Sequence, residues 1–227
     1  MKRKAVRSLG LIVAVVSLLG LSAPSSSGRT SLPACSDRAY KLDGTKWTTP
    51  FRWRFQGPST PKTLRRLAVQ RRLVRAVSTV ASGRNRCGLV SHVSANQRYL
   101  GRTSAHPNIR PNGSCGTPDG RNEVGFGTLP WEYMALTCYW SKNGSTIEAD
   151  IMFNKTDYRW ATRVKAGCSM TWDIQAVATH EFGHAFGLAH VKEDLHGHLT
   201  MAPYILPCQN SESRLGLGDL RGMRALY

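Results

Sequence analysis

Five of the seven histidines in this 227-residue chain lie in one stretch, THEFGHAFGLAHVKEDLHGHLTMAP, at residues 179–203. His180 and His184 are four residues apart in a segment that is predicted to be helical. Their imidazoles therefore project side by side, about one helical turn or roughly 5.4 Å apart along the axis. Two neutral imidazoles on one helix face can bind the same metal ion. The spacing thus predicts that both histidines are metal ligands.

Three further residues extend this site. Glu181 follows the first histidine at the edge of the same helix face, where it can hold and deprotonate a metal-bound water as a general base. Gly187 can adopt the left-handed conformation that ends a helix, and the chain can then return to the metal with His190. Three imidazoles and one open position are what a catalytic zinc requires. His196 and His198 are alternative third ligands, but both lie in a polar segment without this turn.

Hydrophobic periodicity predicts the elements that hold the site. Residues 50–55 alternate aromatic and arginine side chains, which is typical of a half-buried strand. Residues 61–82 change to helical spacing, with one apolar face and arginines pointing away. This apolar face consists of Val69, Leu73, Val77 and Val80. Strand patterns separated by turns follow at residues 122–127, 134–140 and 146–154.

Capping signals set the position of the histidine-bearing helix. Asp173 is its predicted N-cap, because a short carboxylate can accept a hydrogen bond from the first helical turn. A final short helix is predicted at residues 218–227. A chain of 227 residues is long enough for one medium-sized domain with a core of its own.

The first residues predict export. Basic residues precede an apolar run at residues 9–21, which closes on small residues near Ala23, as in a secretory signal. The run is shorter than the roughly 20 apolar residues that span a bilayer. We therefore predict a signal peptide at 1–23, a linker or short N-terminal tail at 24–40, and one domain at 41–227. The protein is expected to be secreted and extracellular, without a membrane span.

Six cysteines follow the predicted signal. An even number in an exported chain predicts three disulfides, and six cysteines allow 15 pairings. The LPAC sequence ending at Cys35 is an alternative site of lipid attachment, but the apolar run stops about ten residues too early for such a site. The six are Cys35, Cys87, Cys115, Cys138, Cys168 and Cys208.

The charge restricts the choice of partners. The formal net charge is +17, and it falls to +13 when the four basic residues of the predicted signal are removed. Such an excess suits anionic partners such as cell-surface polymers, but because the charge is scattered we expect that it mainly keeps an exported protein in solution. The arginines are not interleaved with a stacking set of aromatic residues, so we expect no specific nucleic-acid binding.

The histidine segment completes the pattern H-E-x-x-H-x-x-G-x-x-H, and Met201 follows eleven residues after its last histidine. Other motifs are KW, DGRNEVGFG, EADIMFN and LGLGDLRGMRALY, spread over residues 41–227. In these residues the chain resembles a matrixin-type metzincin, most of all the compact secreted bacterial members. The resemblance implies an α+β, zincin-like fold. This fold has a twisted, mainly parallel sheet with an antiparallel edge strand, two long helices and a small C-terminal subdomain.

The same resemblance implies a metzincin catalytic domain with one catalytic Zn²⁺, held by His180, His184 and His190. Glu181 would be the general base for hydrolysis of peptide bonds by a zinc-activated water. Residues 135–137 would lie on the edge strand and bind a protein or peptide substrate by strand addition. We expect the enzyme to be a monomer.

The chain departs from the family pattern in several places. His92 and His106 do not reproduce the segment that holds a second, structural zinc in animal members. Ca²⁺ is a further candidate cofactor, and Asp150 is the one candidate ligand that we can place. The CGTPD sequence starting at Cys115 resembles the family's cysteine switch, but it lies inside the predicted domain. We interpret this cysteine as part of a disulfide within the domain, with Cys87 as a candidate partner.

Two other functions stay open at this stage. One is a zinc amide hydrolase acting on cell-wall material, which the positive charge would suit. The other is a non-catalytic, zinc-stabilised binding protein that is attracted to anionic surfaces. The intact Glu181 and an open fourth metal position favour catalysis. The sequence therefore predicts a secreted zinc-dependent endopeptidase.

Overall fold

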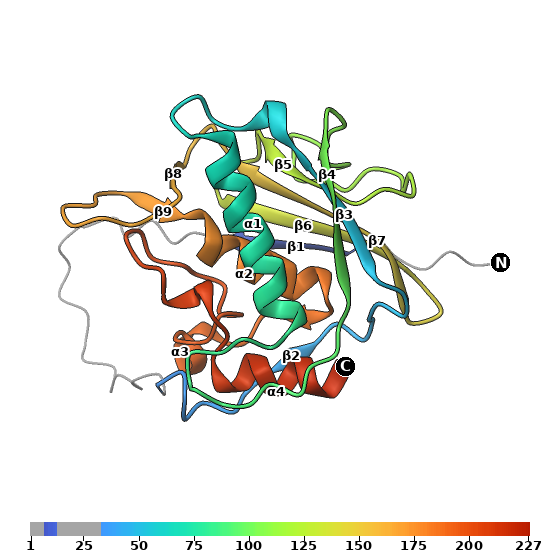
Figure 1. The fold of residues 1–227 in the computed structure, drawn as a ribbon, viewed down its shortest axis with the longest axis vertical. Coiled ribbons are helices and arrows are strands. Elements are labelled where there is room, and N and C mark those ends of the chain that lie inside the picture. The colour runs from blue at the N-terminus through green and yellow to red at the C-terminus, as the bar shows by residue number, and fades with distance from the viewer. Residues whose placement is uncertain (1–6, 13–32) are drawn as a thin grey trace, which may run out of the picture.

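The computed structural model describes residues 7–12 and 33–227, so most of the predicted signal peptide and linker lies outside the described residues. The chain forms a six-stranded mixed sheet with helices packed on one face (Figure 1). The strands are β1 (Arg7–Ile12), β3 (Phe51–Gln56), β4 (Gln97–Thr103), β5 (Glu123–Gly127), β6 (Tyr133–Lys142) and β7 (Ser145–Asn154). The helices are α1 (Arg66–Ala81), α2 (Ile174–Ala185), α3 (Glu193–His196) and α4 (Leu217–Leu226).

The strand order is β1-β6-β7-β5-β3-β4. Four consecutive strands of this sheet are parallel to one another: β7, β5, β3 and β4. β6 is antiparallel to β7. A mixed sheet with helices on one face is an α+β arrangement, as predicted. The antiparallel strand is not outermost, however, because β1 pairs with the free edge of β6.

Short elements connect these parts. β2 (Lys41–Leu42) pairs with β10 (Leu188–Ala189), directly after the histidine-bearing helix, and β8 (Arg159–Ala161) pairs with β9 (Thr171–Asp173) just before it. Two 3-10 turns cover Gly57–Ser59 and Ser211–Ser213. No helix among the described residues is long and apolar enough to cross a membrane.

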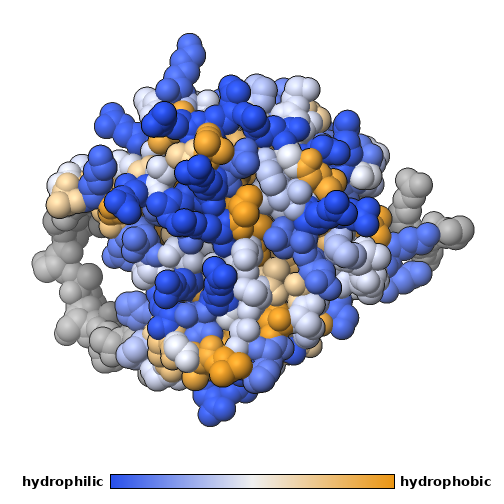
Figure 2. Space-filling view, in the orientation of Figure 1, coloured by the Kyte–Doolittle hydropathy of each residue, from blue (hydrophilic) through white to orange (hydrophobic). Residues whose placement is uncertain are grey.

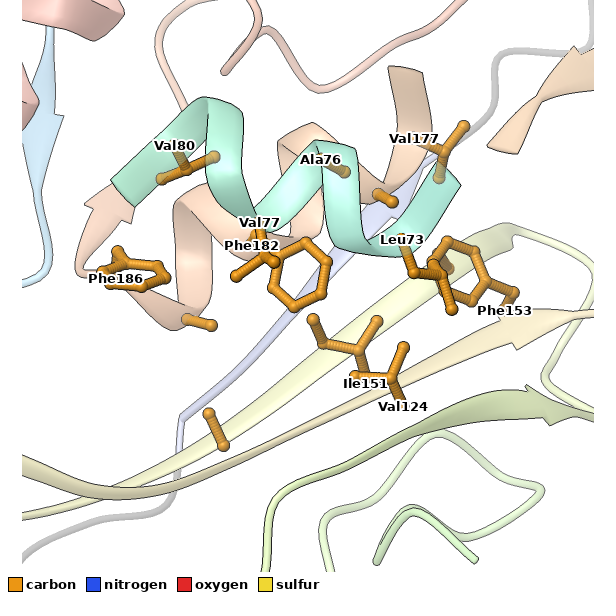
Figure 3. Close-up of a cluster of buried hydrophobic side chains, with 14 of the residues drawn as sticks. Leu73, Ala76, Val77, Val80, Val124, Ile151, Phe153, Val177, Phe182 and Phe186 are labelled. Atoms are coloured by element: carbon orange, nitrogen blue, oxygen red, sulfur yellow. The ribbon is translucent and has the colours of Figure 1, made fainter. Parts of the chain in front are cut away.

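The core lies between the sheet and the pair α1 and α2 (Figure 3). The predicted apolar face of α1 is confirmed, since its four residues are fully buried. They face Phe182 of α2 and the sheet residues Val124, Ile151 and Phe153. Because apolar burial is the main stabilising term of a fold, this layer fixes α2 against the sheet. Phe51 of β3 contributes an edge-to-face ring contact to Phe182, with centroids 6.2 Å apart.

The strand β4 of the main sheet was missed by the periodicity. β4 consists of QRYLGRT and alternates half-buried with exposed positions. Its buried side is weakly apolar, because only Tyr99 there is large and hydrophobic and Gly101 interrupts the run at a φ of 102°. Such a strand at a sheet edge carries little hydrophobic signal.

All six cysteines form disulfides, which confirms the predicted number. The pairs are Cys35–Cys87, Cys115–Cys138 and Cys168–Cys208. The candidate pair Cys115–Cys87 was wrong, since Cys115 is joined to β6 instead. The sulfur of Cys35 is engaged with Cys87, which leaves no thiol there for a lipid.

The N-cap of α2 can be tested by substitution. Asp173 accepts a hydrogen bond of 3.0 Å from the backbone N–H of Ala176. We expect Asp173→Ala to lower the free energy of unfolding by about 1 kcal/mol, because the first turn loses its acceptor. Asp173→Asn keeps an acceptor and serves as the matched control. Urea unfolding at fixed metal concentration measures both, and equal stability of Asp173→Ala and the unaltered chain would contradict this role.

Candidate metal centre

The helix α2 places two of the predicted ligands inside the protein. His180 and His184 are buried, at 0% and 1% exposure. A buried polar ring is costly unless its nitrogens are partnered. The Nδ1 of His180 lies 2.7 Å from the carbonyl oxygen of Thr200, and the Nδ1 of His184 lies 2.8 Å from that of Leu188. One nitrogen of each ring is thus held by the backbone.

The third histidine is brought back by the predicted turn. α2 ends at Ala185, and Gly187 follows with a φ of 101°. A Cβ on this glycine would lie 2.2 Å from the carbonyl oxygen of Thr45, so glycine is needed for both conformation and space. The next two residues form β10, whose pairing with β2 directs His190 to the other two histidines.

The three imidazoles converge on one point. Each pair of Nε2 atoms among His180, His184 and His190 is separated by 3.0 Å. Because a carbonyl oxygen only accepts hydrogen bonds, the Nδ1 atoms of the first two rings must carry the proton. Their Nε2 atoms then present lone pairs to each other and cannot share a hydrogen bond. A cation placed between these nitrogens removes the repulsion.

The electrostatics of the rings favour the same conclusion. Burial, followed by repulsion from the neighbouring histidines, lowers the pKa of His180 well below its ordinary value. Burial lowers the pKa of His184 to about 3 and that of His190 to about 4. The rings are therefore neutral near pH 7, which is the form that binds metal.

Zinc fits this donor set. Two nitrogens about 2.0–2.1 Å from a tetrahedral zinc lie roughly 3.3 Å apart, close to the observed spacing. Within the described residues, these three histidines are the only group of at least three His, Cys, Asp or Glu residues with ligand atoms mutually within 4.8 Å. The structure therefore brings all three predicted ligands together.

A buried aspartate that the sequence did not reveal supports the floor of the site. Asp219 accepts hydrogen bonds from the backbone N–H groups of Thr200, Met201 and Gly216, at 2.7–3.1 Å. Thr200 in turn provides the carbonyl for His180, so Asp219 holds that ligand through one intermediate residue. Met201 is buried, at 2% exposure, as expected of a residue in the floor. Its carbonyl accepts a hydrogen bond from Val191, next to the third histidine.

The predicted general base is buried beside the ligands. Glu181 is 0% exposed, and its Oε2 accepts a hydrogen bond of 2.6 Å from the hydroxyl of Thr137. Its Oε1 has no hydrogen-bond partner among the described residues. Burial raises the pKa of this carboxyl to about 8, and the threonine hydroxyl acts in the opposite direction. Thr137 lies on β6 and was predicted only as part of the peptide-binding edge strand; its contact with Glu181 was not predicted, because nothing in the local sequence links it to α2.

The rival ligands lie elsewhere. The Nδ1 of His196 lies 2.9 Å from Oδ2 of Asp37, and the carbonyl of His198 accepts a hydrogen bond from Arg86. Neither belongs to the converging group. Of the three candidates, His190 is thus the one that the structure places beside His180 and His184.

Asp150, the candidate calcium ligand, has both carboxyl oxygens occupied by backbone N–H groups. The donors are Asn108 and Glu123, at 2.7 and 2.6 Å. Burial raises its pKa to about 8, despite these two hydrogen bonds. The carboxyl thus joins β7 to the loop at Asn108 and to the neighbouring strand β5, and calcium binding there stays a prediction.

A fold of this kind, with three histidine nitrogens converging beside a buried glutamate, has the features of a zinc-dependent metallopeptidase. Comparison with known families gives a more specific likeness: residues 133–227 match the matrixin family of peptidases. The C-terminal part of the chain is therefore similar to matrixin-type metallopeptidases. The matched segment contains the helix with the histidines, the third ligand and the methionine. Comparison with curated proteins gives no match.

The turn at Gly187 predicts a strong effect of one methyl group. We expect Gly187→Ala to weaken zinc affinity at least tenfold, because the added Cβ must displace either Thr45 or the chain that leads to His190. Gly44→Ala is the control: its φ of 82° is also positive, but a Cβ there meets nothing within 4 Å. The control should cost only about 1–2 kcal/mol of stability from backbone strain. Competition with a chromogenic chelator measures affinity, and equal zinc affinities in the two variants would contradict the argument.

Proposed function

We propose that this protein is a secreted zinc endopeptidase with a zincin-like fold, in which Glu181 is the general base. The observation that carries the proposal is the convergence of three Nε2 atoms at 3.0 Å, next to a buried carboxylate. Three disulfides are consistent with an extracellular protein. His180, His184 and His190 would hold the metal.

Each residue of the site has a separate part in the reaction. Bound Zn²⁺ would act as a Lewis acid that polarises the scissile carbonyl and acidifies water. The free Oε1 of Glu181 would accept a proton from the attacking water and then deliver it to the leaving amine. Thr137 would hold the other oxygen, so that the carboxylate cannot turn away. The carbonyls of Thr200 and Leu188 would keep the first two ligands in the required tautomer.

Strand addition to β6 supports a peptide as substrate. One edge of β6 pairs with β7, and the other edge pairs antiparallel with β1. In this pairing Gly10 is opposite Leu136 and Leu9 is opposite Thr137. The edge that was predicted to bind an extended peptide is thus compatible with an antiparallel strand. Backbone hydrogen bonds of this kind recognise a peptide with little regard to its sequence.

The two alternatives are distinguished by the substrate. A zinc amide hydrolase of cell-wall material could use the same three ligands, and a silent binding protein would need no base. A peptide substrate is preferred because the edge of β6 that pairs with the extended segment β1 belongs to the strand that also supplies the hydroxyl partner of Glu181. Incubation with casein and with purified peptidoglycan distinguishes a peptidase from a cell-wall amide hydrolase.

The role of Glu181 predicts a clean separation of metal binding from turnover. Glu181→Gln should keep about one zinc per chain, since this residue is not a ligand, and should reduce cleavage of a quenched peptide by about 10²–10⁴-fold. Metal analysis and steady-state kinetics on the same preparation measure both quantities. Loss of zinc would mean that Glu181 supports the ligands instead, and retained cleavage would exclude it as the base.

The hydroxyl of Thr137 predicts a smaller, position-specific effect. Thr137→Val keeps the side-chain shape but removes the donor to Glu181, and we expect kcat to fall by about 10-fold to 100-fold with little change in KM. Thr137→Ser keeps the donor and should retain most of the activity. If both variants lost activity equally, packing rather than the hydrogen bond would explain the effect.

A further inference from the structure

A second region of interest lies away from the candidate metal centre. A cavity of about 630 Å³ is bounded by the C-terminal half of α1, the loop that follows it, the first turn of α2 and the segment before α4. This volume is in the range of sites that bind small ligands. None of the three converging histidines lines it. The face of the molecule that includes α1 is mostly hydrophilic (Figure 2).

Three arginines from three separate segments line this cavity: Arg75, Arg84 and Arg214. All three are exposed. Within the part of the chain that the structure describes, none of their guanidinium groups makes a hydrogen bond or an ion pair. By contrast, the neighbouring Arg72 donates to the amide oxygen of Gln175 at 3.1 Å, and Arg86 donates to a backbone carbonyl. The three cavity arginines are therefore free to bind a ligand.

The backbone holds two of these arginines side by side. Asn85 and Leu215 form a parallel bridge, and Arg84 and Arg214 each come directly before one bridged residue. The bridge is closed by Leu215 N–H to the Arg84 carbonyl, at 3.1 Å, and by Arg86 N–H to the Leu215 carbonyl, at 3.0 Å. Neighbouring strands are only about 4.8 Å apart, so the two arginine side chains leave the backbone from adjacent positions and their charges can reach the same ligand.

The loop that carries Arg84 is built to stay in place. The side chain of Asn85 accepts hydrogen bonds from the backbone N–H groups of Cys87 and Leu89 and donates to the carbonyls of Gly83 and Leu89. Cys87 is also joined to Cys35 by a disulfide. A preorganised loop loses little conformational entropy when a ligand binds.

The charge around the cavity has one sign. Among the described residues that line it, none is acidic and none is aromatic. Paired like charges are unfavourable in the free protein, and an anion placed between them removes the repulsion. Guanidinium groups bind phosphate and sulfate oxygens through paired, charge-assisted hydrogen bonds. The absence of a stacking surface disfavours nucleic-acid bases as the recognised group.

We propose that this cavity binds the tetrahedral oxyanion groups, phosphate or sulfate, of an anionic polymer. The oxygens are bound by Arg75, Arg84 and Arg214. The side-chain amide nitrogen of Gln175 is a further, neutral donor, because the amide oxygen of the same side chain already accepts a hydrogen bond from Arg72. A polymer bound there lies outside the candidate metal centre. The site thus holds the protein on an anionic surface while the metal centre stays accessible to peptide.

Binding of dextran sulfate, measured by calorimetry on the zinc-loaded protein at fixed ionic strength, tests this proposal. Neutral dextran is the control for the polymer backbone. We expect the triple variant R75Q/R84Q/R214Q to bind dextran sulfate about tenfold or more weakly than the unaltered chain. The charge-matched variant R98Q/R163Q/K165Q removes exposed residues outside the cavity and should lose less than about threefold. Inorganic phosphate and inorganic sulfate should each raise the melting temperature of the unaltered protein but not of the triple variant.

The outcomes are separable from those of the peptidase proposal. Peptide cleavage by the triple variant should be unchanged, which also shows that it is folded, and R75Q alone provides a milder test on an exposed helix position. Equal weakening in both triple variants would mean that diffuse charge, not this cavity, binds the polymer. Duplex DNA that binds as tightly as dextran sulfate through the same arginines would overturn the choice of ligand. A response to phosphate alone, or to sulfate alone, would identify which oxyanion the site selects.

Discussion

The convergence of three imidazole lone pairs is the interaction on which the rest of the site depends. Lone pairs 3.0 Å apart repel each other without a cation, so the protein has to hold the rings in place by other contacts. The carbonyls of Thr200 and Leu188 do so for the two rings on α2, and the β2–β10 pair does so for the third. Each of these contacts needs support from the core, and this explains why α2 is almost wholly buried.

The sequence predicted the convergence of the three histidines because their geometry is local. A four-residue spacing on a helix places His180 and His184 together, and a glycine three residues later is enough to return the chain. The same locality explains why the apolar face of α1 and the N-cap Asp173 were predicted correctly. In each case the relevant partners lie within a few turns of each other.

Contacts between distant segments could not be predicted in this way. Thr137 meets Glu181 only because β6 packs under α2, and Asp219 meets Thr200 only after the C-terminal part folds back. The pairing of Cys115 with Cys138 likewise depends on a loop crossing β6, which spacing does not encode. β6 also combines two tasks, because its backbone edge accepts a strand while one of its side chains holds the glutamate. Under the proposed function, the position of the substrate and the orientation of Glu181 are therefore linked through one strand.

The end of α2 is joined to both ends of the domain. The indole of Trp47 donates to the carbonyl of Ala185 at 2.8 Å, and the hydroxyl of Tyr227 joins the Phe186 carbonyl to the Trp47 N–H. Residues about 180 positions apart must meet before the turn to His190 is fixed. Contacts of such long sequence separation form late in folding. The third ligand is therefore in place only in a completely folded chain, so tight zinc binding would report global folding and a partly folded intermediate would hold metal weakly.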